Sequence, residues 1–244
     1  MIDGHRVLAV VPARSGSKSI PDKNMRQLAG TSLIGWAGIC LAHTPQVDAR
    51  LISTDSAVYA AEGEVYGLAA PFLRPAELSG DAAGAMQVMK HALHEGEAHY
   101  GQRFDVVLLI EPTSPLRLPD DLLRTAEILL AREANAVVTV STLNSQAHPL
   151  KILRIVDGRL VHYDALGEAI VARQQLSSGL YFRNGICYAL TRSCVLNDAR
   201  IFTEKTLAHV ITRPVANIDA PLDLEWAEFL INTPTYAALR AMRS

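Results

Sequence analysis

The sequence predicts a three-layer α/β fold with a mostly parallel sheet, and two patterns support this prediction. Short apolar runs of strand length alternate along the chain with segments whose apolar residues recur at helical spacing. Polar stretches at 13–24, 111–117 and 217–223 fall where strands are expected to have ended. Because strand–helix–strand connections are right-handed and return over the sheet, helices should cover both of its faces.

The overall composition suits one domain, residues 1–244, because the 244 residues are 49% hydrophobic and can form a sizeable core. A formal net charge of −2 provides no basic field for nucleic acid. The sequence has no long apolar run and no signal-peptide pattern, so we expect a cytoplasmic protein without membrane insertion. Its three cysteines lack metal or redox spacing, which fits small buried groups in a reducing compartment.

The first half of the chain alternates regularly between expected strands and helices. Strands are expected at 7–11, 49–53 and 104–110, and helices at 31–42, 56–66, 81–95 and 120–132. Thr31 or Ser32 can cap the first helix, and Trp36 should pack in the core. The apolar run FDVVLLI at 104–110 is typical of a central parallel strand that is covered on both faces.

The second half of the chain departs from this alternation. A strand at 136–141 is followed by a polar stretch, 144–184, with a hairpin at 152–163 that turns at Asp157-Gly158. The stretch is too polar for a core and too long for a turn, so we interpret it as a dimerisation arm that packs on another subunit. The main domain then resumes with strands at 186–190 and 207–212 and a helix at 222–232.

The stretch from Ala13 to Asn24, ARSGSKSIPDKN, is a candidate polyphosphate site because it follows the first strand. Gly16 and the neighbouring serines let backbone N–H groups approach phosphate oxygens, while Arg14 and Lys18 add positive charge. A solvated basic loop is the alternative interpretation. The stretch matches neither G-x-x-x-x-G-K-[ST] nor G-x-G-x-x-G, which argues against a Walker A loop and against a dehydrogenase.

Eight motifs that occur in one order give the chain a family resemblance. They are ARSGSKSIPDKN at 13–24, STD at 53–55, RPAEL at 74–78, EPTSPLR at 111–117, HPLK at 148–151, RQQL at 173–176, NG at 184–185 and NID-x-x-x-DL at 217–224. The chain thereby resembles the acylneuraminate cytidylyltransferases, or CMP-sialic acid synthetases. The resemblance implies a Rossmann-like sheet of the nucleotide-diphospho-sugar transferase type, and a homodimer. It also implies Mg²⁺-dependent transfer of CMP from CTP to a nonulosonic (nine-carbon α-keto acid) sugar in cell-surface polysaccharide biosynthesis.

The resemblance assigns the nucleotide to the first loop and to two later positions. Arg14, Lys18 and Lys23 would be catalytic, because cations beside the phosphates stabilise charge that develops on the pyrophosphate. Lys23 would lie against the α-phosphate, although it can also be a plain surface lysine. Asn24 and Arg74 would contact the base and ribose, although Arg74 can instead pair with Glu77. The expected nucleotide-binding residues are Ala13, Arg14, Ser15, Gly16, Ser17, Lys18, Lys23, Asn24, Arg74 and Asp81.

The sugar would lie beside the later motifs. The expected sugar-binding residues are Glu111, Ser114, Lys151, Arg173 and Asn184, with Lys151 and Arg173 supplied by the partner subunit. Glu111 departs from the Gln that is usual in the family. Because an ionised carboxylate only accepts hydrogen bonds, it suits a sugar with an amino group or an extra hydroxyl donor. We therefore expect a relative of N-acetylneuraminate, such as legionaminic or pseudaminic acid.

Asn217 and Asp219 are the expected metal ligands, at a position where the family usually carries Asp-x-Asp. Mg²⁺ prefers oxygen ligands and completes its shell with phosphates and water. Asn217 keeps a carbonyl oxygen but lacks a charge, so Asp219 becomes the main protein ligand. Asp219 can alternatively cap the helix after Pro221, and capping is the favoured role for Asp223.

Three further assignments stay open at this level. Asp55 is either the N-cap of the helix at 56–66, which we favour, or a ligand contact. No residue stands out as a general base: His148 and His162 are candidates by type but suit structural roles better. A metal-bound hydroxide and the substrate carboxylate are the other candidates for taking the proton. The functional alternatives are a 3-deoxy-manno-octulosonate-type cytidylyltransferase and a non-catalytic nucleotide-sugar-binding homologue.

Two substitutions test the metal assignment. Asp219→Ala removes the main expected ligand, so pyrophosphate release with CTP and Mg²⁺ should be lost. Asn217→Asp adds a carboxylate and should lower the Mg²⁺ concentration that gives half the maximal rate. Unchanged kinetics in Asp219→Ala would remove Asp219 from the metal site.

Overall fold

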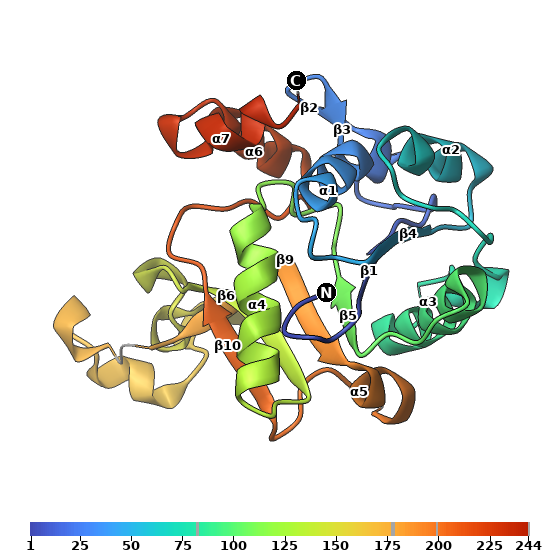
Figure 1. The fold of residues 1–244 in the computed structure, drawn as a ribbon. Coiled ribbons are helices and arrows are strands. Elements are labelled where there is room, and N and C mark those ends of the chain that lie inside the picture. The colour runs from blue at the N-terminus through green and yellow to red at the C-terminus, as the bar shows by residue number, and fades with distance from the viewer. Residues whose placement is uncertain (82, 177–178, 199, 244) are drawn as a thin grey trace.

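The computed structural model describes residues 1–81, 83–176, 179–198 and 200–243, and its centre is a six-stranded sheet (Figure 1). The strand order is β10-β6-β9-β5-β1-β4. These strands are β1 (Val7–Pro12), β4 (Ala49–Ser53), β5 (Val106–Leu109), β6 (Ala136–Thr142), β9 (Tyr181–Thr191) and β10 (Thr206–Val210). Within this sheet β9 is antiparallel to both of its neighbours and the other three strand pairs are parallel, which confirms the mostly parallel sheet.

Helices cover both faces of the sheet, as predicted. On one face α1 (Leu33–Ala42), α2 (Ala57–Val65) and α4 (Pro119–Ala131) share a core with Val7, Ala9 and Val11 of β1. On the other face α3 (Ala85–Tyr100) and α5 (Arg192–Asn197) pack with Leu8 and Val10 of the same strand. Because successive strand residues point to opposite faces, β1 is buried on both sides and the fold has three layers.

A third apolar cluster covers the outer side of α1. It contains residues of α6 (Pro221–Ile231) and α7 (Ala237–Ala241) together with Leu28 of β2 (Gln27–Leu28), which pairs with β3 (Thr31–Ser32) in a small ribbon. Trp36 is fully buried there and its indole N–H donates to Leu28 O at 2.8 Å, which confirms its core role. The Ser32 hydroxyl accepts the Gly35 N–H and caps α1, which selects one of the two predicted caps.

Two elements differ most from their predicted boundaries. The helix expected at 81–95 begins at Ala85 and ends at Tyr100, where Gly101 adopts a φ of 62° and stops it; Ala82 lies outside the described residues. The strand expected at 186–190 is the second half of β9, which already begins at Tyr181. The extension matters because it carries the chain from the arm directly into the centre of the sheet.

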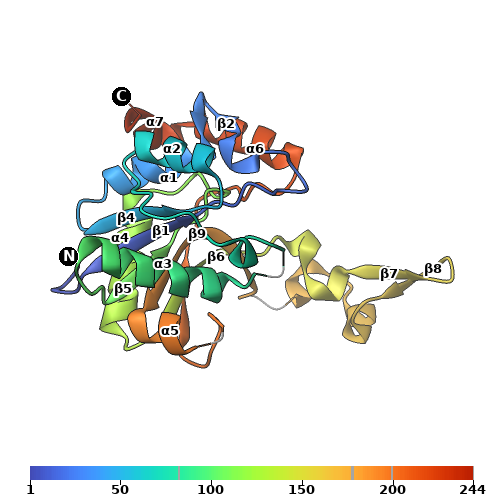
Figure 2. The same cartoon turned by 90° about the vertical axis from the view of Figure 1, so that its right-hand side faces the viewer.

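The predicted arm leaves the three layers, and its hairpin of β7 (Leu153–Val156) and β8 (Arg159–His162) extends away from them (Figure 2). Asp157 and Gly158 both have positive φ, at 48° and 75°, which confirms the predicted turn. The short 3₁₀ helices around the hairpin are η3 (Ser145–Ala147), η4 (Pro149–Lys151), η5 (Ala165–Ala169) and η6 (Arg173–Gln175). The hairpin exposes the apolar residues Leu153, Ile155, Val156, Leu160 and Val161.

The three cysteines are free and buried, as predicted. Burial raises the pKa of the Cys40 thiol to about 12, so this thiol is neutral and unreactive at physiological pH. Within the described ranges, no helix is long and apolar enough to cross a membrane.

Candidate active site

Three loops that follow strands meet at one edge of the sheet, as the sequence predicts. The loop after β1 contacts the loop after β10 through an ion pair between Lys23 Nζ and Asp219 Oδ1, which are 2.9 Å apart. The loop after β5 joins them, because the Ile218 N–H donates to Thr113 O at 2.8 Å. A cavity of about 450 Å³ lies among the loops, and its wall includes Arg14, Lys18, Lys23, Glu111 and Asp219. We call it the phosphate-side cavity.

The loop after β1 places two cations at this cavity. Arg14 Nη1 and Lys18 Nζ lie 2.7 and 2.5 Å from the two carboxylate oxygens of Asp81. The hydrogen bond from Lys18, and then that from Arg14, hold the pKa of Asp81 below its usual range. The two side chains therefore converge on an anion in this structure, which is the arrangement that a polyphosphate needs.

The other predicted nucleotide residues of this loop divide between its base and its tip. Ala13 is buried and donates its N–H to Ser53 O at 2.9 Å, which ties the loop to β4. At the tip, a Cβ on Gly16 would meet no atom within 4 Å, so ligand groups can approach the backbone there. Ser17 lines the phosphate-side cavity, and its N–H donates to Ser15 O at 3.0 Å.

Asp55 supports this loop, and the favoured prediction that it caps α2 was wrong. Its two carboxylate oxygens accept the Ser15 N–H at 2.9 Å and the Ser15 hydroxyl at 3.0 Å. The cap of α2 is Ser56, whose hydroxyl accepts the Tyr59 N–H. The carboxyl end of β4 lies beside that of β1, so the position of Asp55 after a neighbouring strand is the signal that could have identified its role.

A second cavity, of about 270 Å³, adjoins the first, because Pro12, Arg14 and Glu111 line both. Arg74 lies in its wall, is only 6% exposed and donates from Nε to Ser79 Oγ at 3.2 Å. Burial lowers the pKa of Arg74, and no pair with Glu77 forms among the described residues. Asn24 instead lines the phosphate-side cavity, and its amide donates to Arg14 O at 3.2 Å. The two predicted base contacts are therefore in different cavities.

The predicted sugar-binding residues are also separated. Ser114 is buried and its hydroxyl donates to Asn184 O at 2.9 Å. The Asn184 amide donates to Ser141 Oγ at 3.0 Å, so it holds β9 against β6. Lys151, on η4, lines a pocket within the arm, and Arg173 begins η6, where its side chain lies outside what the structure describes. Lys151 lines neither of the two cavities of its own subunit.

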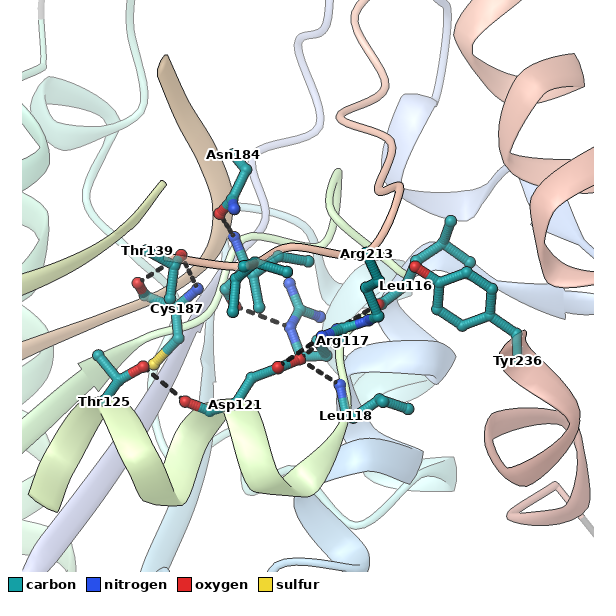
Figure 3. Close-up of polar contacts among 12 residues, drawn as sticks. Leu116, Arg117, Leu118, Asp121, Thr125, Thr139, Asn184, Cys187, Arg213 and Tyr236 are labelled. Carbon is teal, nitrogen blue, oxygen red and sulfur yellow. Dashed lines mark hydrogen bonds and ion pairs between the residues drawn. The ribbon is translucent and has the colours of Figure 1, made fainter. Parts of the chain in front are cut away.

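Two arginines, Arg117 and the partly buried Arg213, hold the loop after β5, and neither was predicted to do so (Figure 3). Arg117 is fully buried; it donates from Nε to Ile186 O at 3.1 Å and from Nη2 to Glu111 O. Arg213 binds the Asp121 carboxylate and donates to Leu116 O at 3.0 Å. Because a buried arginine without partners is costly, these contacts give the loop one stable conformation. In the sequence, only the position of Arg117 at the end of the EPTSPLR motif could have indicated this role.

Glu111 is held so that its carboxylate faces both cavities. Burial raises the pKa of Glu111 against the opposing effect of Arg117 and Arg183, and the negative charge of Asp219 raises it further. Among the described residues its carboxylate accepts no hydrogen bond. Gly185 has a φ of +70°, and a Cβ there would collide with Glu111 Oε2 and Ser114 Oγ, so this close approach requires the glycine of the predicted Asn-Gly pair.

The two predicted metal ligands lie together but differ in orientation. Asp219 faces the phosphate-side cavity, whereas Asn217 directs its Oδ1 to Ser114 Oγ at 3.2 Å and its Nδ2 to Asp219 Oδ2 at 3.4 Å. Asp223 Oδ2 accepts the N–H groups of Asp219 and Ala220 at 2.9 and 2.7 Å, so Asp223 is the cap of α6. No cluster of three metal-ligating His, Cys, Asp or Glu side chains occurs among residues the structure covers. The carboxylates that face the cavity, Glu111 and Asp219, nevertheless are hard oxygen donors that fit Mg²⁺.

Comparisons with known proteins identify the class to which this fold and site belong. Residues 8–190 match the cytidylyltransferase family model, and the chain belongs to that family. It is 29% identical to the CMP-N,N'-diacetyllegionaminic acid synthase of Legionella pneumophila, over 91% of this chain and 94% of that protein.

Two further relatives extend the comparison. The chain is 28% identical to the N-acylneuraminate cytidylyltransferase of Escherichia coli O18:K1:H7 over 91% of its length, but it spans only 51% of that protein. Among solved structures, CMP:2-keto-3-deoxy-manno-octonic acid synthetase complexed with CTP matches with a TM-score of 0.66 over 93% of this chain and 98% of that one. At 16% identity the last likeness shows a shared fold.

Asp121→Asn should destabilise the protein by about 2 kcal/mol or more, because it leaves the partly buried Arg213 guanidinium without its charge partner. Urea unfolding would measure the loss. Glu127→Gln in the same helix is the matched control, since its pair with Arg124 is exposed and should contribute less than about 0.5 kcal/mol. Equal losses in the two variants would contradict the assigned role of Asp121.

Asp55→Ala should raise the KM for CTP about tenfold, because a hydrogen bond to a charged group contributes about 1.5–3 kcal/mol to the ordered loop. Steady-state kinetics with saturating sugar would measure it. Ser56→Ala is the neighbouring control: it removes the α2 cap, should cost about 1 kcal/mol of stability, and should leave the KM unchanged. If the KM for CTP changed in Ser56→Ala but not in Asp55→Ala, the effect would come from the cap of α2 and not from the loop.

Proposed function

We propose that the protein is a CMP-nonulosonic acid synthetase, which couples CTP to a nonulosonic acid and releases pyrophosphate. The observation that carries the proposal is the convergence of Arg14, Lys18, Lys23 and Asp219 on one cavity, beside a smaller cavity lined by Arg74. The named substrate of the Legionella relative supports a legionaminic-type acid. The octulosonate synthetase shares the fold but is only 16% identical. The comparison therefore supports its shorter sugar less strongly as the substrate of this protein.

The site suits in-line displacement without a covalent intermediate. The anomeric hydroxyl of the sugar attacks the α-phosphorus of CTP, the bond to the bridging oxygen breaks, and pyrophosphate leaves with the negative charge. Arg14 and Lys18 would exchange Asp81 for the β- and γ-phosphate oxygens and stabilise that charge. Lys23 lies deeper in the cavity, with its side chain 14% exposed, and would contact the α-phosphate. Binding and charge neutralisation are thus the main contributions of the protein.

The proton of the attacking hydroxyl is not assigned to a histidine. The His148 ring accepts the Leu150 N–H at 3.2 Å, and His162 lines the pocket within the arm, so both belong to the arm rather than to the cavities of their own subunit. The carboxylate of the substrate is the acceptor that we infer. Mg²⁺ would neutralise the triphosphate, with Asp219 as a protein ligand.

We further infer a cytoplasmic homodimer in which the arm of each protomer reaches the cavity of its partner. The hairpin exposes Ile155 at 73% and Leu160 at 69%, which is unfavourable unless another surface covers them. The same arm carries Lys151 and Arg173, whose charges suit a sugar carboxylate. The buried free cysteines fit a reducing compartment.

A substrate panel tests the proposed function. Pyrophosphate release would be measured with CTP, Mg²⁺ and each of N,N'-diacetyllegionaminic acid, pseudaminic acid, N-acetylneuraminate and 3-deoxy-manno-octulosonate. We expect turnover with a nonulosonic acid, and a higher kcat/KM for a legionaminic or pseudaminic acid than for N-acetylneuraminate. A clear preference for N-acetylneuraminate would overturn the substrate assignment, and CTP binding without release from any sugar would indicate a non-catalytic homologue.

A further inference from the structure

The loop after β1 is held at two points by the segment that follows β4. Near the start of the loop, the Asp55 carboxylate accepts the N–H and the hydroxyl of Ser15. Near its end, the Tyr59 hydroxyl donates to Asp22 Oδ1 at 3.1 Å. Tyr59 lies in the first turn of α2, so one short stretch of chain carries both contacts. The two contacts are at opposite ends of the loop.

Tyr59 is a well-anchored donor for the second contact. It is only 3% exposed and belongs to the core that α1, α2 and α4 share with β1. Burial raises the pKa of Tyr59 to about 12, and the hydrogen bond to Asp22 is the next contribution. The hydroxyl therefore stays protonated at physiological pH and remains a donor.

Asp22 has a backbone conformation that needs support. Its φ and ψ are 50° and 40°, in the left-handed region that residues other than glycine seldom adopt, although aspartate tolerates it better than most. The residue is exposed, and its side chain makes no capping hydrogen bond to the described residues of the 3₁₀ helix that follows, η1 (Lys23–Met25). The hydrogen bond from Tyr59 therefore stabilises a sparsely populated conformation at this position.

This conformation sets the direction of Lys23. Asp22 is the residue at which the chain turns into η1, and its carbonyl oxygen accepts the Met25 N–H at 2.9 Å. The Lys23 side chain is 14% exposed and reaches Asp219 Oδ1 at 2.9 Å in the phosphate-side cavity. Because φ and ψ at Asp22 orient the start of η1, a different conformation there would move the Lys23 ammonium away from its present place.

We propose that Tyr59 and Asp22 are positioning residues that hold Lys23 where it contacts the α-phosphate. The proposal rests on the proposed function, which gives Lys23 that contact. It separates the roles of the two ends of the loop. Asp55, through Ser15, orders the end that binds the outer phosphates, so its loss should weaken CTP binding. Tyr59 orders the end that acts on the reacting phosphorus, so its loss should slow turnover.

Steady-state kinetics of Tyr59→Phe tests the proposal, because this substitution removes only the hydroxyl. We expect kcat to fall about tenfold, the effect of losing one hydrogen bond to a charged group, and the KM for CTP to change less than about twofold. This is the opposite of the KM effect expected for Asp55→Ala. Tyr100→Phe is the matched control, since its hydroxyl donates to Arg50 O at 3.2 Å near the start of β4, and both constants should be unchanged.

The position of Lys23 can also be measured without turnover. Acetylation by acetic anhydride, followed by mass spectrometry, reports how accessible each amine is. In the wild type Lys23 should react more slowly than Lys18, whose side chain is 83% exposed. Tyr59→Phe should raise the rate at Lys23 severalfold and leave the rate at Lys18 unchanged, because only one end of the loop is released.

Variants of Asp22 test the other side of the hydrogen bond. Asp22→Asn keeps an acceptor oxygen and tolerates the left-handed conformation, so it should retain most of kcat. Asp22→Ala loses both properties and should lower kcat at least as much as Tyr59→Phe. Combining Asp22→Ala with Tyr59→Phe should add little, since the two residues act through one contact. Thermal unfolding would check that each variant is folded.

Wild-type kcat in Tyr59→Phe, or acetylation of Lys23 that does not change in this variant, would overturn the proposal. Equal losses of kcat in Tyr59→Phe and Tyr100→Phe, in step with their melting temperatures, would give Tyr59 a purely structural role. Failure of the proposed function is distinguished by the wild type, which would then release no pyrophosphate with any sugar in the panel. The acetylation rates would still report whether Tyr59 positions Lys23.

Discussion

The Arg117 guanidinium, buried between β5 and β9, is the interaction from which the geometry of the site follows. It donates to two carbonyl oxygens, that of Glu111 just after β5 and that of Ile186 on β9, and these two strands run in opposite directions. A guanidinium is planar and stays charged even when buried, so it fixes the distance and the angle between the two carbonyls. The Glu111 side chain leaves the backbone at one of these points, and its direction into the cavity is thereby set.

Arg213 extends this control to the far side of the same loop. It links Leu116 O to Asp121 at the start of α4, and the backbone N–H of Leu118 donates to the same carboxylate at 2.7 Å. The loop after β5 is thus held at both ends by arginine side chains, one fully buried and one partly buried. The loop after β1 is held differently, by Asp55 and at a more exposed position. One wall of the phosphate-side cavity is therefore firmly held, and the other contains Arg14 and Lys18, which pair with the exposed Asp81 carboxylate.

The order of the motifs predicted which loops meet, because strand ends in an α/β sheet gather at one edge. It did not predict the direction of β9, since the apolar run ICYAL would be buried in either orientation. It also misassigned Asp55, whose partner Ser15 is 40 residues away, because a cap for the adjacent helix was the local explanation. Arg117 escaped notice as a structural residue because arginine is rarely fully buried. In each case a contact between distant segments decided the outcome.

The pairing of Asp81 with Arg14 and Lys18 bears on which anions the loop can select. Any incoming anion competes with a carboxylate that is attached to the same chain and is therefore present at high effective concentration. A small anion such as orthophosphate would only replace one set of ion pairs with another. A longer polyphosphate can reach Lys23 at the same time and gains contacts that Asp81 does not offer. The loop would then discriminate by the length of the anion as well as by its charge, and the internal carboxylate would act as a competitor that short anions fail to displace.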